Sequence, residues 1–465
     1  MKTGRKDIFW NYAATFMRIA SGIIILPLVL RNLPSEEVGL WSIFLTISSL
    51  TALLDFGFTN SFSRNVAYVF SGVKELKAKG YVSVKHKNAE IDYGLLKSVI
   101  KAMQRYYGVM ALIFLIVFFI ASPLYMSSVL EKYTGNKQEI WLAWFTYGTL
   151  VAYEFYTCYY NSLMSGRGLI KRNMQIIILS QTSKIIVSAL CLYFGLGIIS
   201  LIIGILVSDI MNRTLSYYSF YDHKIKESIK FAEAIPVKDV IKVMAPNALK
   251  IGLTTIGFFA LSQAITLISP FYLTLSEVGQ YGISKQMVSL LISIGGTWFG
   301  TFYPQLTQYR VRNEDENVKR LYIKGLIILF LVFLFAGSGL LFLGNPILVF
   351  IHSKTLLLNS GLLLLMIVFA FFEAAQSIST STLLTKNEVP FFRSVLISGT
   401  ASLILLFVFF KFTNLGVLSM ILAPGIALTL YNNWKWPMMV IRDLKIKPRH
   451  FYDVTVDMIQ LVVKK

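Results

Sequence analysis

The sequence predicts an all-α polytopic membrane protein with about twelve transmembrane helices in two six-helix lobes. Three observations support this fold class. First, 55% of the 465 residues are hydrophobic and only 15% are charged, compared with about 25% charged residues in soluble domains. Second, lysine and arginine are concentrated in alternate loops between apolar segments. Third, short motifs recur at offsets close to half the chain length.

Apolar segments that match or exceed the roughly 20 residues needed to cross a bilayer recur along the chain. In the first half we expect spans at residues 8–30, 37–58, 104–126, 140–163, 174–195 and 197–219. In the second half we expect spans at residues 241–270, 278–303, 323–351, 356–384, 389–411 and 414–438. The first segment is too long for the apolar core of a signal peptide and lacks a small-residue cleavage site, so we expect it to remain as a span.

Lysine and arginine predict the orientation of these spans. If the N-terminus is cytoplasmic, the inner segments carry 34 of these residues, and the outer segments carry only Arg31, Lys132, Lys137, Lys354 and Lys411. Positive residues are retained on the cytoplasmic side of a bilayer, so we expect both termini to be cytoplasmic. The net charge of +20 follows this topology and does not indicate a nucleic-acid partner.

Two motifs recur in both halves. Glu37-Val38-Gly39 and Glu277-Val278-Gly279 are separated by 240 residues, and each lies at the start of a predicted span. A weaker match relates residues 197–200 (GIIS) to residues 416–419 (GVLS) at an offset of 219. We therefore expect two similar lobes, residues 1–232 and 233–465, with the joining loop on the inner side.

The longest inner loop ends in a segment with helical periodicity. Its apolar and basic side chains are expected on different helix faces: Leu95, Leu96, Val99 and Met103 on one, and Lys97, Lys101 and Arg105 on another. This pattern predicts either a basic amphipathic helix that leads into the third span and lies on the inner membrane surface, or a solvated linker.

Residues typical of metal and redox sites are scarce. Cys158 and Cys191 both lie within apolar segments, and the four histidines do not cluster. We therefore expect no disulfide, no metal site and no cofactor. The sequence also lacks a phosphate-binding glycine-rich loop and an H-E-x-x-H motif, which argues against an enzyme.

Ionisable side chains inside the predicted spans are the candidate functional residues. Each costs roughly 2.5–3.5 kcal/mol at the centre of a span, so it should face a partner or a water-filled cavity. Arg18, Lys250 and Lys285 have no obvious acidic partner nearby in the sequence, and we expect them to line such a cavity. Arg18 is about ten residues into the first span, roughly 15 Å deep, which is too deep for easy contact with water outside the bilayer.

Four other intramembrane charges have candidate partners. Asp209 and Arg213 are four residues apart and are expected to form a structural pair on one helix face. Glu154 and Lys184 lie on neighbouring predicted spans, and they too can form a structural pair.

Two further acids are open to more than one interpretation. Asp55 can brace the inner end of the second span together with Arg64, and Glu373 can be protonated and simply pack. The alternative is that Asp55, Glu154 and Glu373 couple transport to an ion or gate the cavity.

Unpaired cations at mid-depth predict an anionic cargo. Phosphate and diphosphate groups suit arginine and lysine because their oxygens accept charge-assisted hydrogen bonds. Polar residues of the first span, such as Asn11, can hydrogen-bond a hydroxyl-rich cargo. We therefore predict that Arg18, Lys250, Lys285 and Asn11 bind a diphosphate or a glycan.

Several longer motifs have the pattern of a known family. The first is Leu33-Pro34-Ser35-Glu36-Glu37-Val38-Gly39-Leu40-Trp41, which follows a first span that contains Pro27. The second is Leu54-Asp55-Phe56-Gly57-Phe58, which is followed by Arg64. The third is Val278-Gly279-Gln280-Tyr281, with Tyr303-Pro304-Gln305 further along the chain. With these motifs the chain resembles the polysaccharide transporter family of the MOP exporter superfamily, and most closely its Wzx-like O-antigen flippases.

The resemblance implies a MATE-like bundle of two six-helix lobes with a central cavity. It implies a flippase that moves a polyprenyl-diphosphate-linked oligosaccharide, such as an O-antigen repeat unit, to the outer leaflet of the bacterial inner membrane by alternating access. Basic cavity residues of the family correspond by position to Arg18, Lys250 and Lys285. Lys250 does not align with Arg18 at the 240-residue offset, so the repeat does not relate these cations.

The resemblance also implies partners and a pathway. The expected partners are the lipid-linked oligosaccharide, membrane lipids, and the polymerase and chain-length proteins of lipopolysaccharide biosynthesis. A multidrug or peptidoglycan-precursor exporter of the same superfamily is the main alternative. A membrane-bound polymerase or transferase is a weaker one, since a polymerase is expected to have a long outer loop.

Overall fold

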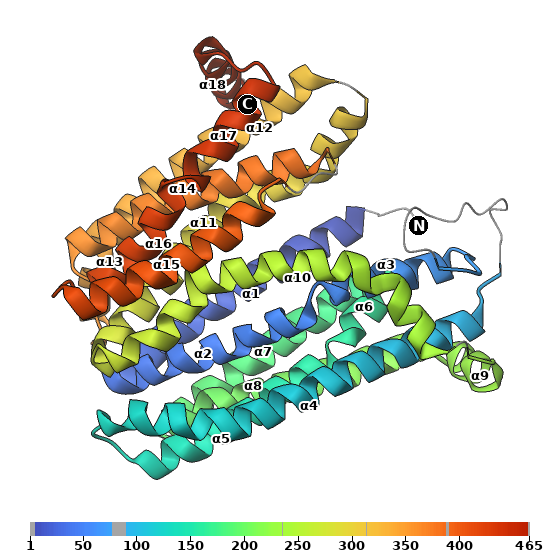
Figure 1. Ribbon diagram of the computed structural model, residues 1–465, viewed down its shortest axis with the longest axis horizontal. Helices are drawn as coiled ribbons and strands as arrows, with labels where there is room; N and C mark the ends of the chain where they lie inside the picture. The colour runs from blue at the N-terminus through green and yellow to red at the C-terminus, as the bar shows by residue number, and fades with distance from the viewer. Residues whose placement is uncertain (1–4, 77–89, 235, 313, 387–389, 464–465) are drawn as a thin grey trace. The chain divides into compact units, whose positions relative to one another are not determined.

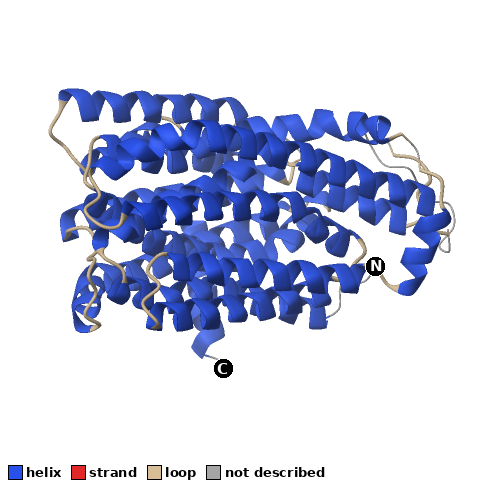
Figure 2. Cartoon of the chain, turned by 90° about the horizontal axis from the view of Figure 1, so that it is seen from below, coloured by secondary structure: helices blue, strands red, loops and turns tan. Residues whose placement is uncertain are grey.

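The computed structural model describes residues 5–76, 90–234, 236–312, 314–386 and 390–463. All regular secondary structure in these ranges is helical (Figure 2). The chain divides into two compact units, Met1–Thr255 and Ile256–Lys465, and the division falls inside α10 (Val237–Ile268). This division is one of compactness, and the lobe boundary predicted between residues 232 and 233 stays a prediction.

The first unit is built from long helices and short connecting ones (Figure 1). Besides the first part of α10, it contains α1 (Arg5–Asn32), α2 (Ser35–Asp55), α3 (Phe58–Phe70), α4 (Tyr93–Glu131), α5 (Lys137–Thr157), α6 (Tyr159–Gly166), α7 (Ile170–Tyr193), α8 (Ile199–Phe220) and α9 (His223–Phe231). The α7–α8 hairpin packs closely, because a Cβ at Gly204 would lie 2.0 Å from Ser188 Oγ.

The second unit has a similar construction. After the end of α10 and a 3₁₀ turn (Ser269–Phe271) it contains α11 (Leu275–Val311), α12 (Asp315–Val332), a π-helical segment (Phe333–Gly337), α13 (Ser338–Phe350), α14 (Ser360–Leu384), α15 (Phe392–Phe412), α16 (Leu418–Thr429), α17 (Asn432–Asp443) and α18 (Pro448–Val463). Gly257 of α10 and Gly399 of α15 lie in contact, so these two helices cross without intervening side chains.

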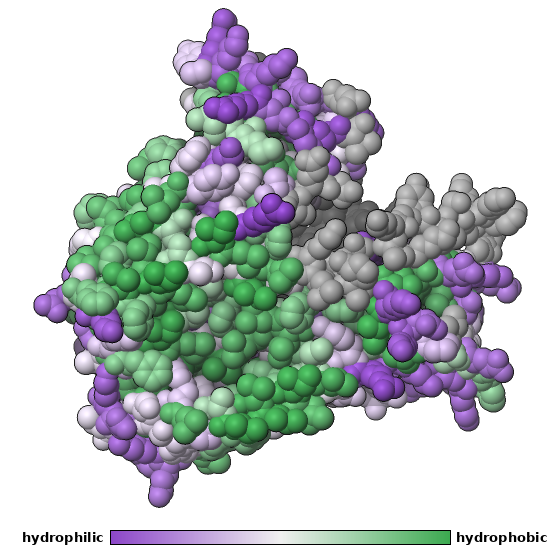
Figure 3. Space-filling view, in the orientation of Figure 1, coloured by the Kyte–Doolittle hydropathy of each residue, from purple (hydrophilic) through white to green (hydrophobic). Residues whose placement is uncertain are grey.

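The surface is that of a multi-pass membrane protein. Hydrophobic residues dominate the visible face, and hydrophilic residues gather over α9 and α18 (Figure 3). Large apolar side chains such as Ile120, Leu124, Phe342 and Phe350 are at least 70% exposed, which in a soluble protein would be unfavourable.

Eight helical stretches among the described residues are long and apolar enough to cross a bilayer. They are Ser35–Asp55, Tyr93–Glu131, Ile170–Tyr193, Ile199–Phe220, Gly252–Phe271, Asp315–Phe350, Ser360–Leu384 and Phe392–Phe412. At the other four predicted positions the chain is also helical, in α1, α5, α11 and the α16–α17 pair. Of these helices, α16 and α17 are each only 12 residues long.

Both repeated motifs adopt matching local structures. A buried leucine lies just before each helix, Leu33 before α2 and Leu273 before α11. One turn into each helix lies a buried valine, Val38 in α2 and Val278 in α11. An apolar pair in these two positions fixes the direction in which the chain enters a helix. The second motif places glycine in the left-handed region in both hairpins, with φ of 53° at Gly197 and 54° at Gly416. Both short sequence repeats therefore coincide with matching local features of the backbone and its apolar contacts.

Residues 95–105 form the predicted helix that leads into the third span, but the environment of its apolar face differs from both expectations. They are the first turns of α4 and continue into the third span as one helix of 39 residues. Leu96 and Met103 are fully buried in a core that includes Phe62 of α3 and Ile225 of α9. The apolar face that suggested a membrane-surface helix is buried by these protein neighbours instead.

Candidate functional site

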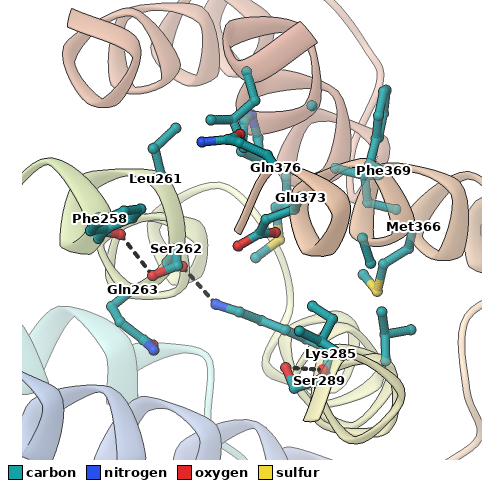
Figure 4. Close-up of a pocket in the computed structure, with 18 of the residues that line it drawn as sticks. Phe258, Leu261, Ser262, Gln263, Lys285, Ser289, Met366, Phe369, Glu373 and Gln376 are labelled. Carbon is teal, nitrogen blue, oxygen red and sulfur yellow. Dashed lines mark hydrogen bonds between the residues drawn. The ribbon is translucent and has the colours of Figure 1, made fainter. Parts of the chain in front are cut away.

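A cavity of about 370 Å³ lies among the helices of the second unit (Figure 4). Its wall on α11 is formed by Tyr281, Lys285, Val288 and Ile292, which recur at the three- and four-residue spacing of one helix face. Further walls come from α10, α14, α16 and the start of α17. The lining mixes apolar side chains with a few polar ones, as ligand sites in proteins commonly do.

Lys285 is the basic residue of this cavity. Its ammonium donates a hydrogen bond of 2.6 Å to the backbone carbonyl of Ser262 and lies 5.8 Å from the ring centre of Tyr281. No described carboxylate oxygen lies within the 4.0 Å of an ion pair. Figure 4 shows the side chain reaching from α11 across the cavity toward α10. Two of the three ammonium donors remain available to a ligand.

Glu373 of α14 points into the same space as Lys285. It lies beyond ion-pair distance but within electrostatic reach of Lys285 and Tyr281. Its side chain is exposed to the cavity rather than packed. Among the described residues, the site therefore holds one base and one acid, and they face a common space without direct contact.

Neutral amides complete the polar lining. Gln263, Gln376 and Asn433 all border the cavity. Oε1 of Gln376 and Oδ1 of Asn433 are buried and accept no hydrogen bond from the described residues. A buried acceptor without a donor is costly, so these two oxygens favour a cavity that is filled by water or by hydroxyl groups of a ligand.

The structure describes some of the predicted binding residues but not all. Lys285 lines the cavity as expected for a cation without a close acidic partner. The side chains of Asn11, Arg18 and Lys250 lie outside the described residues, so their predicted roles stay predictions. Gln263, Gln376 and Asn433 were not predicted from the sequence as site residues, although each is a polar residue within or beside an apolar segment.

The first unit contains a separate cluster of four charges. Asp209 lies within electrostatic reach of Glu154, Arg213 and Lys184, so two acids and two bases from α5, α7 and α8 gather there. Asp209 and Arg213 are not within 4.0 Å, and Arg213 instead donates weakly to the carbonyl of Glu154 at 3.5 Å. The predicted pair is thus part of a looser four-residue group, and its structural role stays a prediction.

Asp55 has a well-defined local environment. Its Oδ1 accepts hydrogen bonds from Thr59 Oγ1 at 2.6 Å, the Thr59 backbone N–H at 3.1 Å and Tyr107 Oη at 2.8 Å. Between α2 and α3, Phe56 and Gly57 both have positive φ, so the carboxylate braces a sharp break in the helix. Arg64 is exposed and makes no ion pair with Asp55 within 4.0 Å. Coupling and gating by Asp55 remain untested.

Solved structures with low sequence identity share this fold, although no protein-family model and no curated protein matches the chain. One is the inward-facing conformation of a multidrug resistance MATE family transporter of the MOP superfamily. Its identity is 15% and its TM-score is 0.66, over 93% of this chain and 95% of that one.

Two further structures extend the comparison. The lipid II flippase MurJ, in an inward closed conformation, has 16% identity and a TM-score of 0.55, over 92% of this chain and 90% of its own. A MOP superfamily transporter from Pyrococcus furiosus, described by the reverse polarity of its binding pocket, has 14% identity and a TM-score of 0.53 over 95% of both chains. The chain therefore has the fold of the MOP superfamily.

Proposed function

We propose that the protein is a MOP-superfamily transporter that moves a polyprenyl-diphosphate-linked oligosaccharide, such as an O-antigen or other surface-polysaccharide repeat unit, to the outer leaflet of a bacterial inner membrane. The MOP fold and the multi-pass topology are the starting point. The cargo is inferred from the chemistry of the cavity and from the motifs that resemble Wzx-like flippases. The N-terminus and the C-terminus would both be cytoplasmic, as the lysine and arginine distribution predicts.

The observation that carries this proposal is the position of Lys285 and the contacts that its ammonium makes. Its ammonium borders a cavity, and among the described residues it donates a hydrogen bond to a backbone carbonyl and has no carboxylate within ion-pair distance. A diphosphate oxygen can replace water at the two free donors and gain strength from the low polarity of the surroundings. The orphaned oxygens of Gln376 and Asn433 can accept hydrogen bonds from sugar hydroxyls. In this proposal Arg18, Lys250 and Asn11 contribute further contacts.

The direct test is flipping of a fluorescent polyprenyl-diphosphate oligosaccharide in proteoliposomes that contain the purified protein. Lys285→Gln removes the positive charge and keeps a hydrogen-bond donor. We expect normal reconstitution and a flipping rate at least about tenfold slower, because roughly one charge-assisted hydrogen bond is lost. Lys285→Arg should retain part of the rate. Lys411→Gln is the matched control, because Lys411 lies at the end of α15 outside the cavity. An unchanged rate in Lys285→Gln would contradict the proposal.

A second candidate is supported by Glu373. An exposed carboxylate in the cavity is the group that a cationic drug would require, and one structure of similar fold is named as a multidrug resistance transporter. The same proteoliposomes can be tested with a fluorescent organic cation. Transport of the cation that is lost in Glu373→Gln and kept in Lys285→Gln would favour this function.

A peptidoglycan precursor also carries a diphosphate. Competition between lipid II and the fluorescent oligosaccharide for transport distinguishes a peptidoglycan-precursor flippase from a flippase for other glycans.

A further inference from the structure

A groove of about 440 Å³ on the first unit is unusually rich in tyrosine. Its wall includes Tyr153, Tyr156, Tyr159, Tyr160, Tyr217 and Tyr218, which come from α5, α6 and α8. Tyr159 and Tyr160 stack with ring centres 4.5 Å apart. Tyrosine combines an apolar ring with a hydroxyl, and it is enriched where the hydrocarbon of a membrane meets the polar headgroups.

One buried cation lines the groove. Arg213 is 8% exposed, lines the groove, and has a buried Nε without a hydrogen-bond partner among the described residues. Its other donors make only long contacts, 3.4 Å to Asn212 Oδ1 and 3.5 Å to the carbonyl of Glu154. Asp209 is near enough for electrostatic attraction but does not form a direct ion pair. Arg213 therefore has guanidinium donors that a further acceptor can satisfy.

A second cation lies next to the groove. The ammonium of Lys226, on α9, is 5.1 Å from the ring centre of Tyr217 and 5.9 Å from that of Tyr218. The side chain of Lys226 is exposed, so its charge is free to approach a ligand in the groove. Arg213 and Lys226 thus contribute two positive charges to the same tyrosine cluster.

An apolar hollow of about 360 Å³ continues from this groove along α8. It is lined by Val207, Ile210, Met211 and Leu215, and it shares Thr214 with the tyrosine groove. These residues precede Tyr217 and Tyr218 in α8, so the apolar hollow lies nearer the middle of the span and the charged end lies nearer α9. Ile210 is 50% exposed, as expected for a surface that meets hydrocarbon.

We infer that this double groove binds one anionic phospholipid of the surrounding membrane. The phosphate accepts hydrogen bonds from Arg213, Lys226 and tyrosine hydroxyls, and one acyl chain lies along Val207, Ile210, Met211 and Leu215. Charge complementarity selects an acidic headgroup over a zwitterionic one. The order of the two hollows along α8 matches a lipid with its headgroup at the membrane surface and its tail toward the bilayer centre. This site is independent of the cargo proposed above.

The test uses the full-length protein in nanodiscs of phosphatidylcholine with an increasing fraction of phosphatidylglycerol, followed by native mass spectrometry of the released protein. We expect one tightly retained phosphatidylglycerol. Lys226→Gln combined with Tyr218→Ala alters only exposed side chains and should weaken retention about tenfold, and Arg213→Gln should weaken it further. Tyr193→Ala is the control, because Tyr193 is 84% exposed and lies at the opposite end of the α7–α8 hairpin.

Three outcomes would overturn the inference. The first is equal retention of phosphatidylglycerol and phosphatidylcholine, and the second is equal retention by the Lys226–Tyr218 double variant and wild type. The third comes from a competition arm. If an equimolar polyprenyl diphosphate displaces the bound phosphatidylglycerol, the groove is an entry site for the cargo lipid and not a site for a resident phospholipid.

Discussion

The two units hold the charges of their membrane helices in different ways. In the first unit two acids and two bases, Glu154, Asp209, Lys184 and Arg213, lie within electrostatic reach of one another. In the second unit a single base, Lys285, shares a cavity with a single acid. In the balanced group the charges compensate one another, and Arg213 also borders the tyrosine groove. The open pair leaves each charge available to a ligand.

The repeat explains part of this difference. The offset of 219 residues that relates Gly197 to Gly416 also relates Glu154 to Glu373, so an acid occupies corresponding helices of both units. The bases do not correspond. At the same offset Arg213 matches Asn432, and Asn432 is fully buried between Ser398 and Trp436. The acid is therefore a shared feature of the two halves, whereas each unit places its cations independently.

The strongest test of this contrast reverses one charge in each unit. Lys285→Glu places two acids in an open cavity, and we expect a loss of transport of more than a hundredfold with normal abundance in the membrane. Lys184→Glu places a third acid in the first-unit group, and we expect low abundance, because an uncompensated buried charge costs about 3–5 kcal/mol. Transport assays and quantitative immunoblots of membranes measure both. Normal abundance of Lys184→Glu would contradict the structural role.

A smaller effect is expected from Asp209 and Arg213, the two residues of the four-charge group that lie on α8. Asp209→Ala leaves Arg213 with less compensation in a buried position, so we expect about 3 kcal/mol of destabilisation. The double variant Asp209→Ala with Arg213→Ala removes both charges and should recover most of the stability. Thermal unfolding in detergent gives the comparison. A double variant no more stable than Asp209→Ala would refute the predicted pairing.

A test with an expected effect of intermediate size concerns Asp55, at the break between α2 and α3. Asp55→Ala removes an acceptor of three hydrogen bonds from Thr59 and Tyr107, so we expect a loss of about 1–3 kcal/mol. Tyr107→Phe removes only one of these contacts and should cost less. Transport per folded molecule should stay unchanged if Asp55 acts only as a brace. A specific loss of transport in Asp55→Asn at normal stability would instead support coupling or gating.

The smallest expected effect concerns Asp443, the last residue of α17 in the second unit. Burial opposes the charged form of Asp443, but hydrogen bonds from Lys386 and Arg310, the latter at 2.7 Å, outweigh it and hold the pKa of Asp443 below its usual value. The resulting stabilisation is present above about pH 4 and is lost as the pH falls through the lower folded-state pKa.

We therefore expect Asp443→Asn to reduce the free energy of unfolding by about 1 kcal/mol at pH 7, with the difference from wild type shrinking below pH 4. Asp222→Asn is a matched variant in the first unit, where the Ile225 N–H and then Arg167 lower the pKa of Asp222. A difference between Asp443→Asn and wild type that does not change with pH would contradict the ion-pair origin.

Features that depend on local spacing could be predicted from the sequence. The helices follow from apolar length, and both repeated motifs keep their local structure because an apolar pair at a helix start and a left-handed glycine are decided within a few residues. Lys285 stands out because a cation in an apolar segment is costly. Neutral amides such as Gln376 carry a smaller penalty, so sequence alone does not separate a cavity-lining amide from a packed one.

Features that depend on which helix faces meet could not be predicted. The four-charge group requires α5, α7 and α8 to converge, and the contact of Tyr107 with Asp55 joins residues 52 positions apart. The helix at the start of α4 was predicted, but the protein neighbours that cover its apolar face were not, since the pattern of apolar side chains does not reveal whether lipid or protein covers them.

The π-helical segment between α12 and α13 has a geometric consequence for the second unit. A π-turn holds one residue more than an α-turn, so the helix beyond it is rotated by about 100° relative to an uninterrupted α-helix. Phe333 and Gly337 are buried, whereas Phe335 is 72% exposed. The 36-residue stretch Asp315–Phe350 therefore has a phase shift at this joint. Deleting one residue from the joint would restore a continuous α-helix and keep the lipid-facing stripe of α13 in place, whereas straightening the joint without a deletion would turn that stripe toward its protein neighbours.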